Sequence, residues 1–369
     1  FMQALTIRVY HRRIPDKVRQ VPNVGQIMSL AKNAPTLDDV AKLARVSTAT
    51  VSRCLNNPDR VVEKTRERVL DAVQNLGYTP NFAARVMAAK RSFTIGAIIP
   101  TMDNAIFARG LQAFQEELHR RGYTLLVASS AYSPQIEEEQ IKALVARGAD
   151  GLLLIGHDRD SAIYDYLDVQ GIPTLSAWSI LPDMRLPSVG FDNLGAMKAL
   201  TEEVLSLGHQ KLAMISAIAR GNDRAQARID GFREAIQDKG LEFENVQVVE
   251  TTYEIESGAR GFAQIIESDA HVTAVLCGND VIAAGALSAA KEMGYKVPED
   301  VSITGFDDMD LGRIVEPALT TVHVPHHKMG VKAAQELVAM VEHKSADVPH
   351  CLESQIVLRN SLGPVKSTL

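Results

Sequence analysis

Apolar runs of strand length alternate with helical runs over most of this chain, from about residue 94 to residue 305. The predicted strands span 94–100, 124–128, 151–155, 174–177, 211–216, 273–277 and 301–305. The predicted helices span 108–121, 135–147, 194–207, 224–239, 257–267 and 282–293. This alternation predicts parallel sheets with helices on both faces, and there is enough of it for two sheets. We therefore expect an α/β fold.

The charge is unevenly divided along the chain. The net charge is −6, but residues 36–91 hold ten Lys and Arg against six Asp and Glu, and residues 1–35 hold six against one. Residues from 92 onward therefore carry −15. A basic N-terminal segment can neutralise DNA phosphates while the acidic remainder of the chain stays away from the duplex. The length of 369 residues also predicts two or three domains rather than one.

Two short helices joined by a tight turn are predicted at the start of the basic segment. Their buried faces are formed by Leu37, Val40, Ala41 and Ala44 in the first helix and by Val51 and Leu55 in the second. Val46 closes the turn, and Ser47 is placed to cap the second helix. The result is a helix-turn-helix pattern.

The second helix of this pattern turns a mostly small, polar face outward. Thr48, Ala49 and Ser52 let its backbone approach a flat partner, and Arg53 offers a forked donor that matches guanine O6 and N7. Arg53 could instead be an ordinary solvated charge on a helix. Within this pattern we expect it to contact DNA in the major groove.

An ordered set of short motifs runs through this segment. In chain order they are Val40-Ala41, Val46-Ser47, Thr50-Val51-Ser52-Arg53, Lys64-Thr65-Arg66, Gly77-Tyr78, Pro80-Asn81 and Ala84-Arg85. The set resembles the lactose-repressor (LacI/GalR) family of bacterial transcription regulators, and the resemblance continues to about residue 364. It implies a helix-turn-helix DNA-binding head followed by a two-lobe core like a type I periplasmic sugar-binding protein. The cleft between the lobes would hold a small effector.

Three residues depart from the pattern of that family. Arg45 stands where the turn usually has Gly, Val62 where a Ser commonly caps the third helix, and Met87 where the hinge usually has Leu. A non-Gly residue in a left-handed turn costs roughly 1 kcal/mol, and a missing helix cap costs a similar amount. We expect the head to fold with reduced stability.

The segment 81–90, after a third predicted helix at 64–76, is rich in alanine. A helix of this length is marginal alone, so we expect it to form only when a partner buries its face. In the resembled family this is the hinge helix, which inserts an apolar side chain into the minor groove. The DNA-binding residues that the resemblance implies are Thr48, Ala49, Thr50, Ser52, Arg53, Asn56, Asn81, Arg85 and Met87.

The expected domains follow from these segments. Residues 1–35 are predicted to be a disordered basic extension, which could also touch DNA, and residues 36–91 the head with its hinge. Residues 92–364 form the effector-binding and dimerisation core. The expected lobes are 92–191 with 322–349 and 192–321 with 350–364, with crossovers near Phe191, Thr321 and Pro349.

Polar residues directly after the strands are the candidates for ligand binding, because ligands of parallel sheets sit at the carboxyl ends of strands. By resemblance, Arg228, Asn279 and Asp307 bind the effector, Phe107 offers an apolar or stacking wall, and Asp192 belongs to the same rim. Carboxylate, amide and guanidinium groups together suit a polyhydroxylated ligand. The alternatives are ordinary: Asp and Asn often cap helices, Phe107 could be core, and Arg228 could be a surface residue.

An enzymatic function is the main alternative from another functional class. The sequence has no G-x-G-x-x-G after a strand, no P-loop, no G-x-S-x-G elbow and no H-E-x-x-H. The three cysteines and ten histidines lack metal-ligand spacing, so we expect no metal and no cofactor. A two-lobe small-molecule receptor without a DNA role is the alternative function, although it would have no use for a DNA-reading head.

We therefore predict a cytoplasmic transcriptional regulator, a repressor of carbohydrate-related genes, and not an enzyme. It would bind double-stranded operator DNA as a homodimer, because two half-sites need two heads. A sugar, a sugar acid or a related small molecule would be its effector. The longest apolar runs, 95–100 and 151–156, are far too short for a membrane span.

Overall fold

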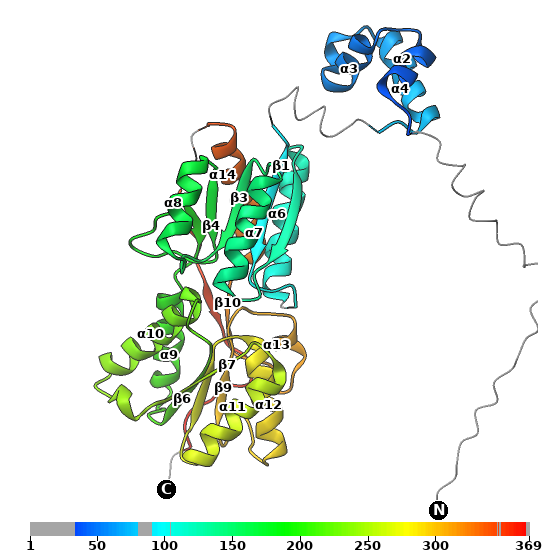
Figure 1. Ribbon diagram of the computed structural model, residues 1–369. Coiled ribbons are helices and arrows are strands. Elements are labelled where there is room, and N and C mark those ends of the chain that lie inside the picture. Colours follow the sequence, from blue (N-terminus) through cyan, green and yellow to red (C-terminus); the bar gives the residue numbers. More distant parts are fainter. Residues whose placement is uncertain (1–33, 80–90, 104, 345, 347, 367–369) are drawn as a thin grey trace, which may run out of the picture. The chain divides into compact units, whose positions relative to one another are not determined.

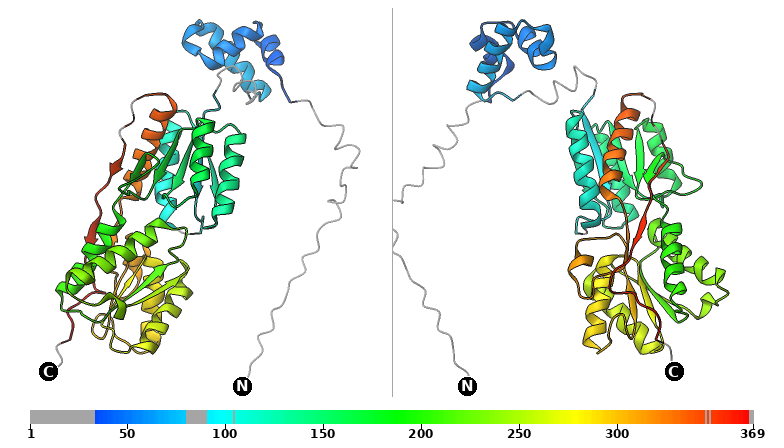
Figure 2. Two further views of the ribbon diagram at one scale, coloured as in Figure 1. Left: turned by 60° about the vertical axis from the view of Figure 1, so that its left-hand side comes forward. Right: turned by 180° about the vertical axis from the view of Figure 1, so that it is seen from behind.

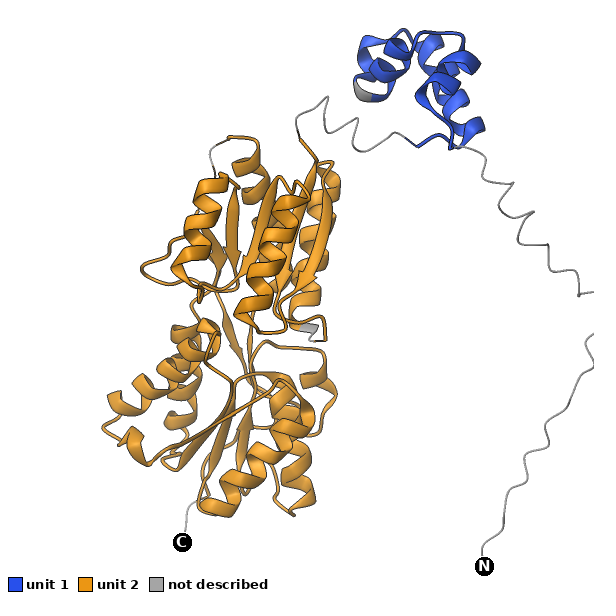
Figure 3. Ribbon diagram, in the orientation of Figure 1, with its two compact units in different colours: residues 1–89 blue, residues 90–369 orange. Residues whose placement is uncertain are grey.

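The computed structural model describes residues 34–79, 91–103, 105–344, 346 and 348–366, with the side chains of Asn56 and Ala105 left undescribed. The chain forms two compact units, Phe1–Ala89 and Lys90–Leu369 (Figure 3). We call the described part of the first unit the head and that of the second unit the core. Almost all of the expected N-terminal extension and the whole of the expected hinge lie outside the described residues.

The head, over residues 34–79, is a bundle of α-helices built as the sequence predicts (Figure 1). Its elements are α2 (Leu37–Ala44), α3 (Thr48–Asn56), the 3-10 turn η2 (Pro58–Arg60) and α4 (Glu63–Leu76). One apolar core joins them: Val40, Ala41 and Ala44 of α2, Val51 and Cys54 of α3, and Val69 and Ala72 of α4 are buried. Packing of these faces fixes α3 against α2 and leaves the other side of α3 exposed.

The helix ends of the head show how local chemistry defines its elements. Thr36 and Asp39 form a reciprocal capping box at the start of α2, and the Ser47 hydroxyl accepts a hydrogen bond from the Thr50 N–H at the start of α3 (3.2 Å). Gly77 ends α4 with a left-handed φ of 62°. Val62 precedes α4 and provides no side-chain hydrogen bond, in line with the departure seen in the sequence.

Arg45 ends α2 in the left-handed conformation, with φ 54° and ψ 51°. We expect Arg45→Gly to stabilise the head by roughly 0.5–1 kcal/mol, because glycine relieves the left-handed cost and loses part of that gain to a more flexible unfolded chain. Hydrogen exchange of head amides in the full chain would measure it. Arg45→Ala, which keeps a Cβ, is the control and should give no gain; equal gains for both variants would contradict the argument.

The first lobe of the core contains a parallel sheet with strand order β11-β5-β4-β3-β1-β2. The strands are β1 (Thr94–Ile99), β2 (Thr124–Ser129), β3 (Gly151–Ile155), β4 (Thr174–Ala177), β5 (Ser188–Gly190) and β11 (His350–Cys351). Helices α6 (Ala105–Arg120) and α14 (His326–Val341) cover one face, and α7 (Pro134–Ala146) and α8 (Ser161–Gln170) cover the other. Because both faces are covered, adjacent residues such as Ala97 and Ile98 are both buried, in different clusters.

The second lobe repeats this plan with a parallel sheet of order β7-β6-β8-β9. The strands are β6 (Leu212–Ala217), β7 (Gln247–Thr251), β8 (Ala274–Cys277) and β9 (Ser302–Thr304). One face carries α9 (Asn193–Ser206) and α10 (Asp223–Asp238), the other α11 (Ile255–Ser268) and α12 (Asp280–Glu292); the short elements are η3 (Phe243–Asn245) and α13 (Leu311–Ile314). The α/β class predicted from the sequence is confirmed.

The two lobes are connected by crossing segments, seen best from behind in Figure 2. The chain first passes between β5 and α9, and it returns through β10 (Thr321–His323), which pairs antiparallel with β12 (Gln355–Val357). The third crossover, expected near Pro349, lies after residues 350–351. Residues 350–351 pair with β5 as β11, because hydrogen bonding to this strand edge extends the first sheet. The assignment of residues 350–351 to the second lobe was therefore wrong.

Within the described residues, no helix combines the length and the apolarity that a membrane crossing requires.

Candidate DNA-reading face and effector cleft

The outward side of α3 carries the residues predicted to meet DNA. Thr48, Ala49 and Arg53 are exposed, while Val51 and Cys54 on the opposite side are buried. Thr50 and Ser52 are half-buried, and the Thr50 hydroxyl lies 2.9 Å from the Ser47 hydroxyl. Thr50 thus takes part in the start of the helix as well as in its outer surface. The Asn56 side chain and all of Asn81, Arg85 and Met87 lie outside the described residues.

Arg228 on α10 lies at the centre of the predicted effector site. Its guanidinium group donates hydrogen bonds to the Asn193 side-chain oxygen (3.0 Å), the Gly278 carbonyl oxygen (2.5 Å) and the Asp307 carboxylate (3.3 Å). The group also lies 3.8 Å from the centroid of the Phe306 ring. Arg228 is only 6% exposed, so it is not the surface residue that the sequence left possible.

Within the described part of the chain, Asp307 and Asn279 each keep one buried polar atom without a hydrogen-bond partner. Asp307 follows β9 with a positive φ of 98°, and its Oδ2 atom is buried with no hydrogen-bond partner among the described residues. Asn279 caps α12 by accepting a hydrogen bond from the Ile282 N–H (2.8 Å), and its Nδ2 atom likewise has no partner in the described chain. A buried acceptor or donor that makes no hydrogen bond raises the free energy of the folded protein unless a further group binds it.

Phe107 and Asp192 lie in different surroundings. Phe107 is buried, and its ring meets the Trp178 ring edge-on, with 5.5 Å between centroids. Asp192 is exposed and caps α9 by accepting a hydrogen bond from the Gly195 N–H (2.9 Å). It lines a cavity of about 1490 Å³ between the lobes. Its neighbour Asn193, which also follows the strand but was not chosen as an effector residue, makes the contact to Arg228.

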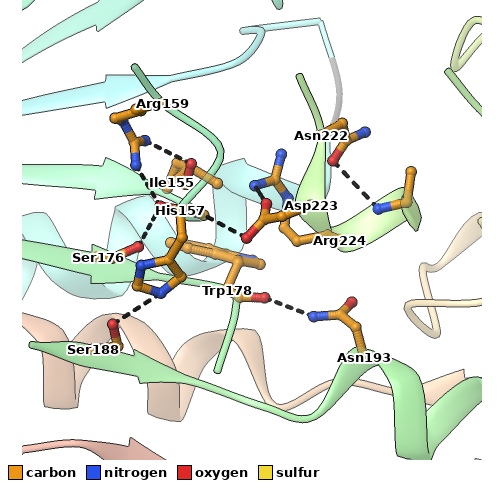
Figure 4. A network of polar contacts seen from close by, with 12 residues as sticks. Ile155, His157, Arg159, Ser176, Trp178, Ser188, Asn193, Asn222, Asp223 and Arg224 are labelled. Carbon is orange, nitrogen blue, oxygen red and sulfur yellow. Dashed lines mark hydrogen bonds and ion pairs between the residues drawn. The ribbon is translucent and has the colours of Figure 1, made fainter. Parts of the chain in front are cut away.

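A network that sequence reasoning missed joins the strand ends of the first lobe to the start of α10 (Figure 4). The Asp223 carboxylate accepts hydrogen bonds from the His157 backbone N–H (2.9 Å) and from the Arg224 guanidinium group (2.8 Å). Burial by itself would raise the pKa of Asp223, but Arg224 and the His157 N–H outweigh it and hold this pKa below its ordinary value. Asp223 is therefore a charged link between the two lobes.

Two histidines of the cleft are neutral groups. Burial lowers the pKa of His157, and it lowers the pKa of His326 to about 4. The His326 Nδ1 atom accepts a hydrogen bond from the Trp178 indole N–H (3.1 Å), which fixes the ring beside the aromatic wall. At neutral pH these side chains offer hydrogen bonds to a ligand and no positive charge.

One signal could have found most of these residues. His157 follows β3, Trp178 follows β4 and Asp223 begins the helix after β6, each at the carboxyl end of a parallel strand. The rule that selected Asn279 and Asp307 applies equally to these strand ends. Among the described residues, no cluster of His, Cys, Asp and Glu is arranged to hold a metal ion.

Asp280, buried beside this site, should make the stability of the core depend on pH. Its carboxylate accepts hydrogen bonds from the Thr321 hydroxyl (2.7 Å) and the Met309 N–H (2.6 Å). Burial raises its pKa to about 7, with Asp307 and Asp308 adding to the rise. The native state thus keeps a proton that the unfolded chain releases near pH 4, so this group lowers stability as pH rises from about 4 to 7.

We expect Asp280→Asn to remove that dependence. Urea unfolding of the wild type and the variant at pH 5 and at pH 8 would measure it. From pH 5 to pH 8 the unfolding free energy of the variant should rise relative to that of the wild type, because at pH 8 only the wild type must bury a charge. A difference that stays constant between the two pH values would contradict the assignment.

Comparison with known proteins identifies both units. A family described as "Bacterial regulatory proteins, lacI family" matches residues 36–81, and one described as "Periplasmic binding proteins and sugar binding domain of LacI family" matches residues 92–361. The HTH-type transcriptional regulator GntR of Escherichia coli (strain K12) is 32% identical over 86% of this chain and 95% of its own length. The HTH-type transcriptional repressor CytR of the same strain is 31% identical over 89% of this chain and 97% of its own.

Solved structures agree with these relatives. A LacI-family transcriptional regulator from Silicibacter pomeroyi matches with a TM-score of 0.81 at 26% identity, covering 89% of this chain and 99% of its own. The lac repressor dimer bound to operator and an anti-inducer matches with a TM-score of 0.79 at 25% identity, covering 89% and 98%. The matched head argues against the alternative of a receptor without a DNA role. The chain is a DNA-binding transcriptional regulator rather than an enzyme, and it belongs to the LacI family of bacterial regulatory proteins.

Proposed function

We propose that this regulator is a cytoplasmic, homodimeric repressor of carbohydrate-related genes whose core binds a sugar or a sugar acid between its lobes. The head and hinge would comprise residues 36–91 and the effector-binding core residues 92–364, with the third crossover after Cys351. The observation that carries the effector class is the buried group formed by Arg228, Asp307 and Asn279. It combines a fork of donors, a carboxylate acceptor and an amide in one place.

The chemistry of this group suits a polyhydroxylated ligand. Each sugar hydroxyl both donates and accepts, so one hydroxyl can donate to the unpartnered Asp307 oxygen while another accepts from the Asn279 amide. The edge-on rings of Phe107 and Trp178 supply an apolar wall of the kind that packs against the C–H face of a sugar ring. Two structural neighbours bind such ligands: one is a complex of the regulator CelR with cellobiose, and another is the lac repressor bound to ONPG.

Operator binding would use Thr48, Ala49, Thr50, Ser52, Arg53 and Asn56 in the major groove and Asn81, Arg85 and Met87 at the hinge. The structural neighbour bound to operator is a dimer, which supports the same assembly here. Occupancy of the cleft would change the angle between the lobes, and that change would form or melt the hinge helix. Coupling of this kind is typically about 1–3 kcal/mol.

The test is a titration of an operator, selected from random duplexes with the full chain, in the presence and absence of candidate effectors. Glucose, glucuronate and glucose 6-phosphate represent a neutral sugar, its acid and its phosphate. We expect at least one class to change operator affinity roughly 5- to 150-fold, and linkage requires operator to change affinity for that effector by the same factor. Gln237→Ala, an exposed change on the same helix as Arg228 and outside the lining of the cavity, should respond normally.

Binding of an effector without any change in operator affinity would reject the coupling. Normal regulation in an Asp307→Asn variant would reject the site, because the variant removes the carboxylate acceptor.

A further inference from the structure

Four of the five predicted effector residues are enclosed by protein, and only Asp192 lines the large cavity. Phe107, Arg228, Asn279 and Asp307 are each at most 6% exposed. The cavity of about 1490 Å³ between the lobes is lined by other residues, and the small cavity beside Arg224 has a volume of only about 30 Å³. A sugar therefore reaches the four residues only when contacts between the lobes part.

One of these contacts is a pair of stacked tyrosines. Tyr132 comes from the loop between β2 and α7 in the first lobe, and Tyr253 comes from the loop between β7 and α11 in the second. Their ring centroids lie 5.8 Å apart with 30° between the planes. The Asn222 side chain donates a hydrogen bond to the Tyr253 hydroxyl oxygen (3.3 Å) and so orients that ring.

Tyr132 lies where two cavities between the lobes meet. It lines both the large cavity and the small one, and the other residues shared by the two cavities include Arg159 and Asp223. Burial raises the pKa of the Tyr132 hydroxyl, and the charges of Arg224, Asp307 and Arg228 also act on it. The ring thus lies within electrostatic reach of Arg228 and Asp307.

The backbone that holds Tyr132 is strained. Ala131 and Tyr132 are consecutive non-glycine residues with left-handed φ values of 50° and 56°. The loop is held by hydrogen bonds from the Ser130 N–H to the Ile99 carbonyl oxygen (2.9 Å) and from the Ser133 N–H to the Ser130 carbonyl oxygen (2.8 Å). Such conformations persist where the surroundings enforce them, and they concentrate at ligand clamps and switches.

We propose that Tyr132 and Tyr253 form an aromatic gate between the lobes, which must open for an effector to reach Arg228, Asn279 and Asp307. The gate rests on the proposed effector site, but its opening can be measured without any effector. Polar contacts also bridge the lobes, among them the bond from the His157 N–H to Asp223, the bond from the Asn193 side chain to the Trp178 carbonyl oxygen, and the ion pair between Arg109 and Asp310. The ring pair is thus one of several contacts that close the cleft, and its loss should favour opening roughly 2- to 10-fold.

The chain contains its own reporter of opening. Trp178 is the only tryptophan in the sequence, it is 2% exposed, and its ring lies against Phe107. Its carbonyl oxygen accepts a hydrogen bond from the Asn193 side chain of the second lobe (3.0 Å). Acrylamide quenching of its fluorescence in the full-length, ligand-free protein measures how often solvent reaches it. We expect Tyr132→Ala and Tyr253→Ala each to raise the quenching constant at least about twofold, and the double variant no further, because losing either ring abolishes the stack.

Two controls separate gating from general damage. Tyr132→Phe keeps the ring and should quench like the wild type, and Tyr166→Ala removes a half-buried tyrosine of the first lobe that packs outside the cleft. Circular dichroism must show the fold of each variant intact. Quenching of Tyr132→Ala and Tyr253→Ala equal to wild type, or an equal rise in Tyr166→Ala, would overturn the gate.

The same fluorescence separates this proposal from the effector assignment. Titration with glucose, glucuronate and glucose 6-phosphate tests the site, whereas acrylamide quenching without ligand tests the gate. Failure of all three ligands with the expected rise in quenching would reject the ligand class and keep the gate. Binding of a ligand, together with unchanged quenching in the tyrosine variants, would keep the ligand class and reject the gate.

Discussion

Replacing Arg228 by alanine is expected to lower the free energy of unfolding of the core by about 3 to 5 kcal/mol and to abolish the response to effector. The loss is large because Asp307 is 1% exposed and would keep a buried charge without its guanidinium partner. The same change also leaves the Asn193 side-chain oxygen and the Gly278 carbonyl oxygen without the hydrogen bonds that Arg228 donates to them. Urea unfolding followed by the fluorescence of Trp178, which lies in the core, would measure this loss.

A second arginine on the same helix provides a matched control. Arg233 pairs with Asp230, but both side chains are more than a third exposed, so solvent screens their attraction. We expect Arg233→Ala to cost about 1 kcal/mol or less, which includes its contact with the Phe243 ring. Equal losses for the two variants would show that burial of the Arg228 pair is not what matters.

The stability loss bears on how the effector role is tested. Arg228→Ala removes function and stability together, so a missing response could reflect partial unfolding. Asp307→Asn keeps the shape of the side chain and removes its charge, and it is the better test of binding. Arg228→Ala with unchanged stability and normal effector response would overturn both the energetic argument and the site.

Arg53→Ala is expected to weaken binding to the selected operator roughly 5- to 150-fold, which corresponds to about 1–3 kcal/mol. Arg53 is exposed on α3, on the opposite side of the helix from the buried Val51 and Cys54, where a base edge can be reached. Binding to random duplexes should weaken much less. Fluorescence anisotropy with both DNAs at a fixed salt concentration would measure the two affinities.

Lys64→Ala is the control for this prediction. Lys64 is exposed near the start of α4, and a phosphate contact from it would support binding to any sequence. Its loss should therefore weaken operator and random DNA alike and reduce the salt dependence. A similarly uniform loss for Arg53→Ala would mean that Arg53 contacts phosphate and does not read a base.

Much of the fold could be predicted because its signals are local. Apolar periodicity located the helices of the head and the longer strands, and Ser47 and Gly77 marked helix ends through interactions within a few residues. The strands not predicted are β5, β7, β10, β11 and β12. Four of these have only two or three residues, which is too short for a period, and β7 is half-buried without a continuous apolar run.

By itself, the sequence determined the two kinds of unit, the family, and the identity of Arg228, Asn279 and Asp307 as candidates, since each follows from a local motif or strand end. Tertiary structure alone decided that Arg228 is tied to Asn193, 35 residues away, and to Gly278, 50 residues away. It also decided that Tyr132 stacks on Tyr253 and that His157 faces Asp223. The contacts of Arg228 lie within the second lobe and depend on how its helices and strand ends pack together. The other two contacts join the two lobes, so their geometry depends on how the lobes pack. No spacing along the chain encodes either kind of contact.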